Sequence, residues 1–327
     1  MSLHEVKPKV SVVLCTFNGA TYVEELLNSV LTQTLRPAEL VVFDDGSSDS
    51  TLKIIDRILS GPLAVGIDLH IQQNSQPLGV AKNFSGALKT AKYSLITLAD
   101  QDDVWYPNRL EKLAEWFSGD SRILLVHSDA DVIDSGGQKI GSLLGHLRIT
   151  RAEKRSLVAK GGLGALLRRN LVTGTTVMLR RDLLDTGLPV PGRFMHDEWL
   201  ALVAAMRGGV KLDTDKLVAY RQHGKNVVGV RRTPRLLSGL MVARSTFQHP
   251  PRVLSNRVEA LQEFMDNPVE WVPRDARDAL EKTVKHQIWR SQLASHRLLR
   301  VIPVLVSLMT RRYSRCGRGL ADAFADF

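Results

Sequence analysis

Roughly the first 120 residues alternate between short apolar runs and longer stretches in which apolar residues recur every three or four positions. The short runs, rich in β-branched residues, are Val10–Thr16, Glu39–Phe43, Leu69–Gln72 and Ser94–Ala99. Such runs predict buried strands, and the stretches between them predict amphipathic helices. The alternation predicts an α/β fold with a doubly wound, mostly parallel sheet, which binds ligands at the carboxyl ends of its strands.

The helices between these strands have recognisable signals. Thr21 and Glu24 have the spacing of an N-terminal capping box for the first helix. Residues 52–59 carry the apolar stripe of a second helix, and Val80–Ala91 is the third. Further along, Ile123–His127 and Thr175–Leu179 predict strands, whereas residues 136–145 and 161–164 are expected to be Gly-rich loops.

The net charge of +10 is concentrated in the last third of the chain. From Arg231 to Phe327 there are 17 Lys and Arg against 9 Asp and Glu. This shift divides the chain into an α/β domain, residues 1–230, and a helical, basic C-terminal extension, residues 231–327. Val301–Met309 is the longest apolar stretch of the extension, contains a proline, and is too short to cross a bilayer.

The basic extension has two readings that the sequence leaves open. It either contacts an anionic membrane surface, with Leu293–Met309 lying in the interface plane, or packs as ordinary helices with solvated basic faces. It has no nucleic-acid-binding motif and no interleaved aromatic residues, so no nucleic-acid partner is expected. Cys15 and Cys316 are too far apart in sequence to suggest a disulfide framework, and residues 1–9 contain no apolar segment. A cytoplasmic protein is therefore predicted, and the first reading of the extension would make it peripheral at the inner face of the membrane.

Acidic residues follow two of the predicted strands. Three carboxylates lie at the end of the fourth strand, on Asp100, Asp102 and Asp103. A bound cation would relieve their mutual repulsion, and a solvated acidic turn is the alternative. The cation is favoured only if other polar residues converge on the same place. Oxygen ligands favour Mg²⁺ or Mn²⁺, which proteins bind with few carboxylates and substrate phosphates. Asp44–Asp49 ends the second strand and faces the same crevice, or forms a hydrogen-bonded turn before the next helix. A carboxylate there can accept the imide N–H of uracil or thymine, and Thr16 and Asn18 can add polar contacts.

The segments Ser11–Asn18, Asp44–Asp49 and Leu98–Pro107 together resemble the GT-A glycosyltransferases of family 2, over residues 9–230. The resemblance implies a Rossmann-like, mostly parallel central sheet flanked by helices, and a metal-dependent hexosyltransferase. It places Asp45 on the base of a nucleotide-sugar donor. It implies that Asp100 binds the ribose, while Asp102 and Asp103 bind the Mg²⁺ or Mn²⁺ that bridges the diphosphate. Lys82 stands where the family usually has the arginine of an Arg-Asn pair near the nucleotide.

The resemblance also implies a catalytic base and, near the end of the domain, a segment that contacts the diphosphate or its metal. Inverting members have an acidic pair at a helix start, which matches Phe194–Trp199 here, although position 196 is His instead of Glu. Asp197 is therefore assigned as the base that deprotonates the acceptor, with Glu198 as the less favoured candidate. His223 is expected to bind the metal and Arg221 the diphosphate, although a structural histidine and a surface ion pair are the alternatives.

Within that family, the pattern most resembles rhamnosyltransferase-like bacterial members that build surface polysaccharide. This implies dTDP-L-rhamnose as donor, with a UDP-hexose as the alternative, and a lipid-linked or lipopolysaccharide-core saccharide as acceptor. Because His196 departs from the family pattern, a non-catalytic module that binds nucleotide sugars or glycans also stays open.

Overall fold

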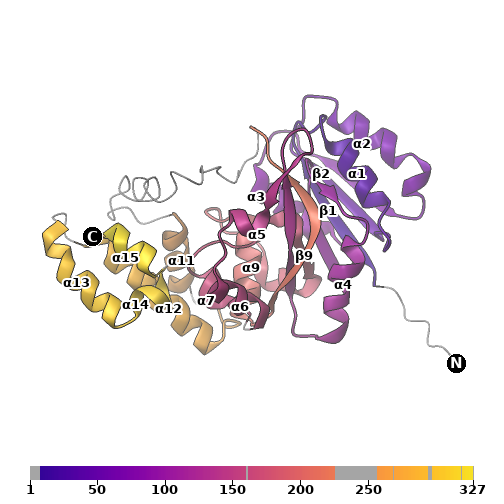
Figure 1. The fold of residues 1–327 in the computed structure, drawn as a ribbon. Helices are drawn as coiled ribbons and strands as arrows, with labels where there is room; N and C mark the ends of the chain where they lie inside the picture. Colours follow the sequence, from indigo (N-terminus) through magenta and orange to yellow (C-terminus); the bar gives the residue numbers. More distant parts are fainter. Residues whose placement is uncertain are drawn as a thin grey trace. The chain divides into compact units, whose positions relative to one another are not determined.

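The structure, a computed structural model, describes residues 8–159, 161–224, 256–267, 269–293, 297–317 and 319–326. These residues form two compact units (Figure 1). The first unit contains the described residues up to Gly162 and from Leu171 to Gly224, and the second contains Leu163–Asn170 and the described residues from Asn256 onward. The boundary predicted at residue 230 lies outside the described residues, and Leu163–Asn170 group with the second unit instead of the first.

The centre of the first unit is a mixed sheet of nine strands in its described residues. The strands are β1 (Val10–Thr16), β2 (Glu39–Asp44), β3 (Asp68–Gln73), β4 (Leu95–Asp100), β5 (Val104–Trp105), β6 (Leu125–Ile133), β7 (Lys139–Ser142), β8 (Val177–Arg180) and β9 (Val210–Arg221). Their order is β3-β2-β1-β4-β8-β6-β9-β5, and β7 pairs with β6. The four strands from β3 to β4 are parallel, but β8 is antiparallel to both of its neighbours. The predicted α/β class with a mostly parallel sheet is confirmed. Parallel pairing joins the four strands from β3 to β4 and also joins β6 to β9, whereas the antiparallel β8 interrupts the doubly wound pattern.

Helices cover both faces of this sheet. In Figure 1, α1 and α2 lie on one side and α3 and α9 on the other. The helices of the first unit are α1 (Val23–Leu31), α2 (Thr51–Leu59), α3 (Val80–Thr90), α4 (Arg109–Gly119), α5 (Leu143–His146), α6 (Arg151–Ala159), α8 (Leu184–Gly187) and α9 (His196–Met206). Because both faces are covered, β1 and β2 are almost entirely buried, while β3, at the sheet edge, is exposed.

Two local predictions are wrong. The capping box does not form, because α1 begins at Val23 with no side-chain cap, and the carbonyl of Gly19 accepts the N–H groups of Tyr22 and Val23 instead. Residues 136–145 are not simply a loop. Gly137, with a positive φ of 85°, makes the tight turn that returns the chain as β7, whose Lys139 pairs with Asp131 of β6 at 2.8 Å.

The second unit is helical. Its helices are α7 (Leu163–Leu166), α11 (Asn256–Asp266), α12 (Arg274–Ser291), α13 (Arg297–Met309), α14 (Arg312–Cys316) and α15 (Leu320–Asp326). Arg290 of α12 forms ion pairs with Asp322 at 3.1 Å and Asp326 at 2.6 Å, and Tyr313 donates its hydroxyl hydrogen to Asp326. The core of this unit therefore combines apolar packing with a buried ion pair. Among the described residues, no helix has both the length and the apolar character needed to span a membrane.

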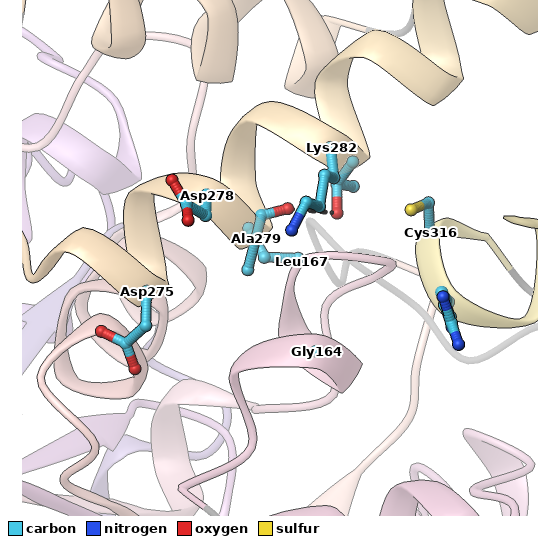
Figure 2. Close-up of a pocket in the computed structure, with 9 residues that line it drawn as sticks. Gly164, Leu167, Asp275, Asp278, Ala279, Lys282 and Cys316 are labelled. Atoms are coloured by element: carbon cyan, nitrogen blue, oxygen red, sulfur yellow. Dashed lines mark hydrogen bonds between the residues drawn. The ribbon is translucent and has the colours of Figure 1, made fainter.

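A cavity of about 310 Å³ lies within the second unit (Figure 2). Acidic Asp275 and Asp278 and basic Lys282, all on α12, line it together with Arg315 and Cys316. Side chains of both signs share its wall, so it has no marked preference for an anion or a cation. None of the site residues predicted from the sequence lines this cavity.

Candidate active site

The acidic run ends β4 at the carboxyl edge of the sheet. Asp100 is the last residue of the strand, and both it and Asp102 are partly buried. Burial, followed by the charges of Asp102 and Asp197, raises the pKa of Asp100 to about 7. Three carboxylates that come from two separate parts of the chain thus converge on one spot. Such crowding suits a site that receives a cation or a polar substrate.

Asp102 and His223 approach each other from the segments that follow β4 and β9. The His223 Nε2 atom lies 2.7 Å from Asp102 Oδ2, and the imidazole ring stacks on Tyr22 with the ring centroids 5.3 Å apart. The carboxylate suits Mg²⁺ or Mn²⁺ when substrate phosphates complete the shell, and the imidazole nitrogen is a better ligand for Mn²⁺ than for Mg²⁺. Within the described ranges, no group of three or more His, Cys, Asp or Glu residues could hold a metal ion. The donor set of this chain therefore fits a metal only in combination with a substrate.

Asp103 does not join this pair. Its side chain is fully buried, and its Oδ1 accepts the backbone N–H of Arg221 at 2.8 Å. Burial, with the charges of Asp102 and Asp100, raises the pKa of Asp103 well above its usual value. The carboxyl group ties the acidic run to β9 through Oδ1, and its predicted contact with a metal stays a prediction.

Arg221 is also placed differently from the prediction. Its guanidinium is 3% exposed, donates to the carbonyl of Asp102 at 2.8 Å and pairs with Glu25 at 2.6 Å. It lies over the ring of Tyr22 as well, 4.6 Å from the centroid. Because this guanidinium is buried and bound by protein groups, a direct contact with the diphosphate would require these bonds to break. Its bond to the Asp102 carbonyl holds the acidic run in place and so positions Asp102.

Asp197 lies in the first turn of α9, as the helix-start assignment requires. Its Oδ2 accepts the backbone N–H of Gly174 at 2.9 Å, and its Oδ1 accepts that of Glu198 at 2.7 Å. Burial raises the pKa of Asp197 to about 6. A carboxylate with this pKa is mostly ionised at neutral pH and is well suited to accept a proton.

A short 3-10 turn, Gly174–Thr176, connects Asp197 with Asp100. While Gly174 binds Asp197, a backbone hydrogen bond from Thr175 acts on Asp100 and lowers its pKa against the effect of burial. The buried Arg109 guanidinium donates to the carbonyl of Thr175 at 2.6 Å and anchors the turn. The prediction that a strand begins at Thr175 missed this turn. The only signal was the run of small residues Thr173–Thr176 ahead of the strand.

His196 occupies the position where the family pattern has an acid. It is buried and stacks on Phe84 with centroids 3.8 Å apart, and burial lowers its pKa to about 3. Neither ring nitrogen has a hydrogen-bond partner among the residues that the structure describes. Its Nε2 lies against Gly174, where an added Cβ would approach it to 3.2 Å. His196 is therefore a neutral packing element behind the turn that holds Asp197.

Asp45 directly follows β2, and its carboxylate is bound by the protein. Oδ1 accepts hydrogen bonds from the Asn74 side chain and the Leu78 N–H, and Oδ2 accepts one from the Gly79 N–H, each at 2.8 Å. Asp45 is only 6% exposed. The carboxylate predicted to bind the nucleotide base thus fixes the loop that leads into α3.

Thr16 and Asn18 brace the neighbouring turn. The Thr16 hydroxyl donates to Asp44 at 2.7 Å, and the Asn18 Oδ1 accepts the N–H of Ser48 at 2.9 Å. Gln101 then joins this turn to the acidic run, because its amide exchanges two hydrogen bonds with the backbone of Phe17. The loops after β1, β2 and β4 form one rim.

Lys82 lies on the first turn of α3 and is exposed. Within the described part of the chain it has no ion-pair partner. Lys82 is one of the residues predicted to contact the nucleotide-sugar donor, and no carboxylate of the described residues neutralises its charge.

Comparisons with known proteins identify the family of this chain. The profile described as Glycosyl transferase family 2 matches residues 11–175. An uncharacterized glycosyltransferase of Nostoc sp. is 28% identical over 67% of this chain and 66% of its own length. One of Haemophilus influenzae is 24% identical over 68% of each chain. The matches therefore span about two thirds of these relatives.

Solved structures show the same fold at low identity. S. aureus TarS residues 1–349, in complex with UDP-GlcNAc, is 17% identical with a TM-score of 0.55 over 97% of this chain and 89% of that chain. The mannosyltransferase PcManGT of Pyrobaculum calidifontis, in complex with GDP-Man and Mn²⁺, is 16% identical with a TM-score of 0.53 over 98% and 86%. The mixed sheet flanked by helices is the GT-A fold.

Proposed function

The chain belongs to glycosyl transferase family 2, and on that premise we propose that it is an inverting transferase that moves a sugar from a nucleotide donor to a hydroxyl of a saccharide acceptor. The observation that carries this proposal is the turn Gly174–Thr176, which binds Asp197 and Asp100 through successive backbone groups. One carboxylate with the pKa of a base is thereby held beside a carboxylate of the donor-binding strand end.

In this proposal Asp197 accepts the proton of the acceptor hydroxyl. The acceptor oxygen forms a bond to the anomeric carbon from the face opposite the nucleotide, the bond to the diphosphate breaks, and the anomeric configuration inverts. The N–H groups of Gly174 and Glu198 fix the orientation of the carboxylate. These contacts favour Asp197 over Glu198 as the base.

Asp102 and His223 are the residues that would hold Mg²⁺ or Mn²⁺ together with the donor diphosphate. Such an ion neutralises the charge that develops on the departing nucleotide. Asp100 is assigned to the ribose and Lys82 to the nucleotide phosphates, because Lys82 is an exposed cation on the helix next to the rim. Asp103 and Arg221 position these residues, because Asp103 accepts the backbone N–H of Arg221 and Arg221 donates to the carbonyl of Asp102.

The donor we propose is dTDP-L-rhamnose, with a UDP-hexose as the alternative. The support is the sequence pattern that includes Asp100–Trp105, His196–Leu200 and Arg221–Asn226. TarS binds UDP-GlcNAc and PcManGT binds GDP-Man, but at 16–17% identity neither assigns a donor to this chain. A thermal-shift screen of dTDP-rhamnose, UDP-hexoses and GDP-mannose with Mn²⁺ distinguishes them, because the true donor raises the unfolding temperature most.

The acceptor we propose is a lipid-linked or surface-polysaccharide saccharide, used at the cytoplasmic face of the membrane. The support is the basic character of the second unit, which favours an anionic surface.

The test of transfer is donor turnover by Asp197→Asn beside the matched variant Glu198→Gln. We expect the first to lose a factor on the order of 10³ in kcat and the second to lose less, since only Asp197 acts as the base. Donor affinity should be kept by both. Unchanged turnover in Asp197→Asn would show that the mechanism is wrong.

His196 motivates a second candidate, a binding module without activity. Calorimetric donor binding by the wild-type protein, with no turnover on any acceptor or on water, would favour that candidate over transfer.

A further inference from the structure

Helix α13 in the second unit exposes several of its apolar residues and buries two of its polar ones. Ile302 is 74% exposed and Met309 83% exposed, whereas Arg300 and Ser307 are buried. Leu299, Leu305 and Val306 lie on the exposed side as well. A helix of a soluble domain normally buries its apolar face and exposes its charges. The outward face of α13 thus lacks the polar residues that would suit it to water.

Helix α15 packs against α13 and adds to this feature. Its Leu320 is 64% exposed and its Phe324 68% exposed. The exposed apolar residues of the two helices are here called the α13–α15 surface. The segment 297–319 contains six arginines and no Asp or Glu. Of these arginines, Arg311 and Arg312 are exposed where α13 meets α14. Exposed apolar side chains together with exposed cations are the two features of a surface that binds anionic lipid.

We infer that the α13–α15 surface docks on an anionic lipid bilayer, with α13 lying along the interface. Helix α13 has 13 residues with Pro303 inside it, a length that suits lying in the interface and is too short to cross the bilayer. A second copy of the chain is a poorer occupant, because a symmetric contact would bring the same arginines against one another. The inference deepens the proposed function by naming the membrane contact of a transferase with a lipid-linked acceptor.

Vesicle co-sedimentation of the full chain tests this inference without donor, metal or turnover. Its failure and the failure of the proposed transfer are therefore distinguishable. We expect the wild type to sediment with vesicles of phosphatidylglycerol and phosphatidylcholine in roughly a 30:70 ratio, and not with phosphatidylcholine alone. Ile302→Asp should lower partitioning roughly tenfold, because one apolar contact with the bilayer is lost. Met309→Asp should act in the same direction.

The matched control is Val65→Asp, since Val65 is 71% exposed but belongs to the first unit. It should sediment like the wild type, and circular dichroism checks that every variant keeps its helices. The inference is overturned if the wild type binds neither vesicle, or if both aspartate variants bind like the wild type. It is also overturned if light scattering shows a dimer that Ile302→Asp dissociates while vesicle binding stays unchanged.

Discussion

The carboxyl ends of β2 and β4 look alike in sequence but differ in the structure. At the end of β2, Asp44 and Asp45 each accept three hydrogen bonds from nearby protein groups. At the end of β4, Asp100 is crowded by Asp102 and by Asp197, and its pKa is raised to about 7. Protein donors already satisfy the first acidic run, whereas the crowding of the second favours a cation or substrate. An acidic run thus shows its role only through its partners.

The strongest way to break this comparison is Asp102→Asn. We expect donor affinity measured with Mn²⁺ to fall by a factor on the order of 100, because the variant removes a proposed metal ligand. Calorimetric titration with and without Mn²⁺ measures the effect, and the metal-free affinity of the same variant serves as its control. Equal affinities for wild type and variant in the presence of Mn²⁺ would place the metal elsewhere. His223→Gln should weaken metal-dependent binding in the same way.

Gly174→Ala sharpens the comparison by disturbing the turn that binds Asp197 and Asp100 at the crowded end of β4. The added Cβ would lie 3.2 Å from His196 Nε2, which is a tight contact, and 3.8 Å from Asp197 Oδ2, which is an ordinary one. His196 or the turn must therefore move, and the turn carries the N–H group that binds Asp197. We expect kcat to fall about tenfold with little change in donor affinity, because a small misplacement of the base slows the chemical step. Gly192→Ala is the matched control, since no atom lies within 4 Å of its added Cβ. Equal losses of kcat in the two variants would contradict the role of the turn in placing Asp197.

Asp45→Asn should have the smallest effect on donor binding. The amide cannot accept all three hydrogen bonds, so we expect a loss of about 1–3 kcal/mol in the free energy of unfolding. Chemical denaturation measures this loss, and a parallel donor titration should show a smaller change than Asp102→Asn. Lost donor binding with unchanged stability would instead support the direct contact between Asp45 and the nucleotide base that the sequence predicted.

Local patterns predicted the first half of the sheet well. The apolar runs that became β1, β2 and β4 are short and β-branched, and their flanking turns fix where each strand ends. The family assignment followed from the order of the motifs and is shown by the match to residues 11–175. The antiparallel β8 was not predictable, because strand direction depends on pairing with residues far away in sequence.

The roles of individual residues depend on the same distant partners. Nothing in the local sequence shows that the Arg221 guanidinium binds Asp102 and Glu25, or that Asp45 receives its hydrogen bonds from residues 74–79. The buried Arg109 escaped notice because a cation near a helix start normally indicates an exposed position. Convergence of Asp102 with His223 was expected from the resemblance, but its 2.7 Å geometry came from the fold.

The central claim is that Asp197 is the base, and the dependence of kcat on pH tests it most directly. Burial raises the pKa of Asp197 to about 6, so lowering the pH through that value protonates the carboxylate and removes the base. At saturating donor, kcat should be nearly constant above pH 7 and fall with a midpoint near 6, and Asp197→Asn should lack this transition. An identical transition in wild type and Asp197→Asn, or a rate that rises as the pH falls, would contradict the account.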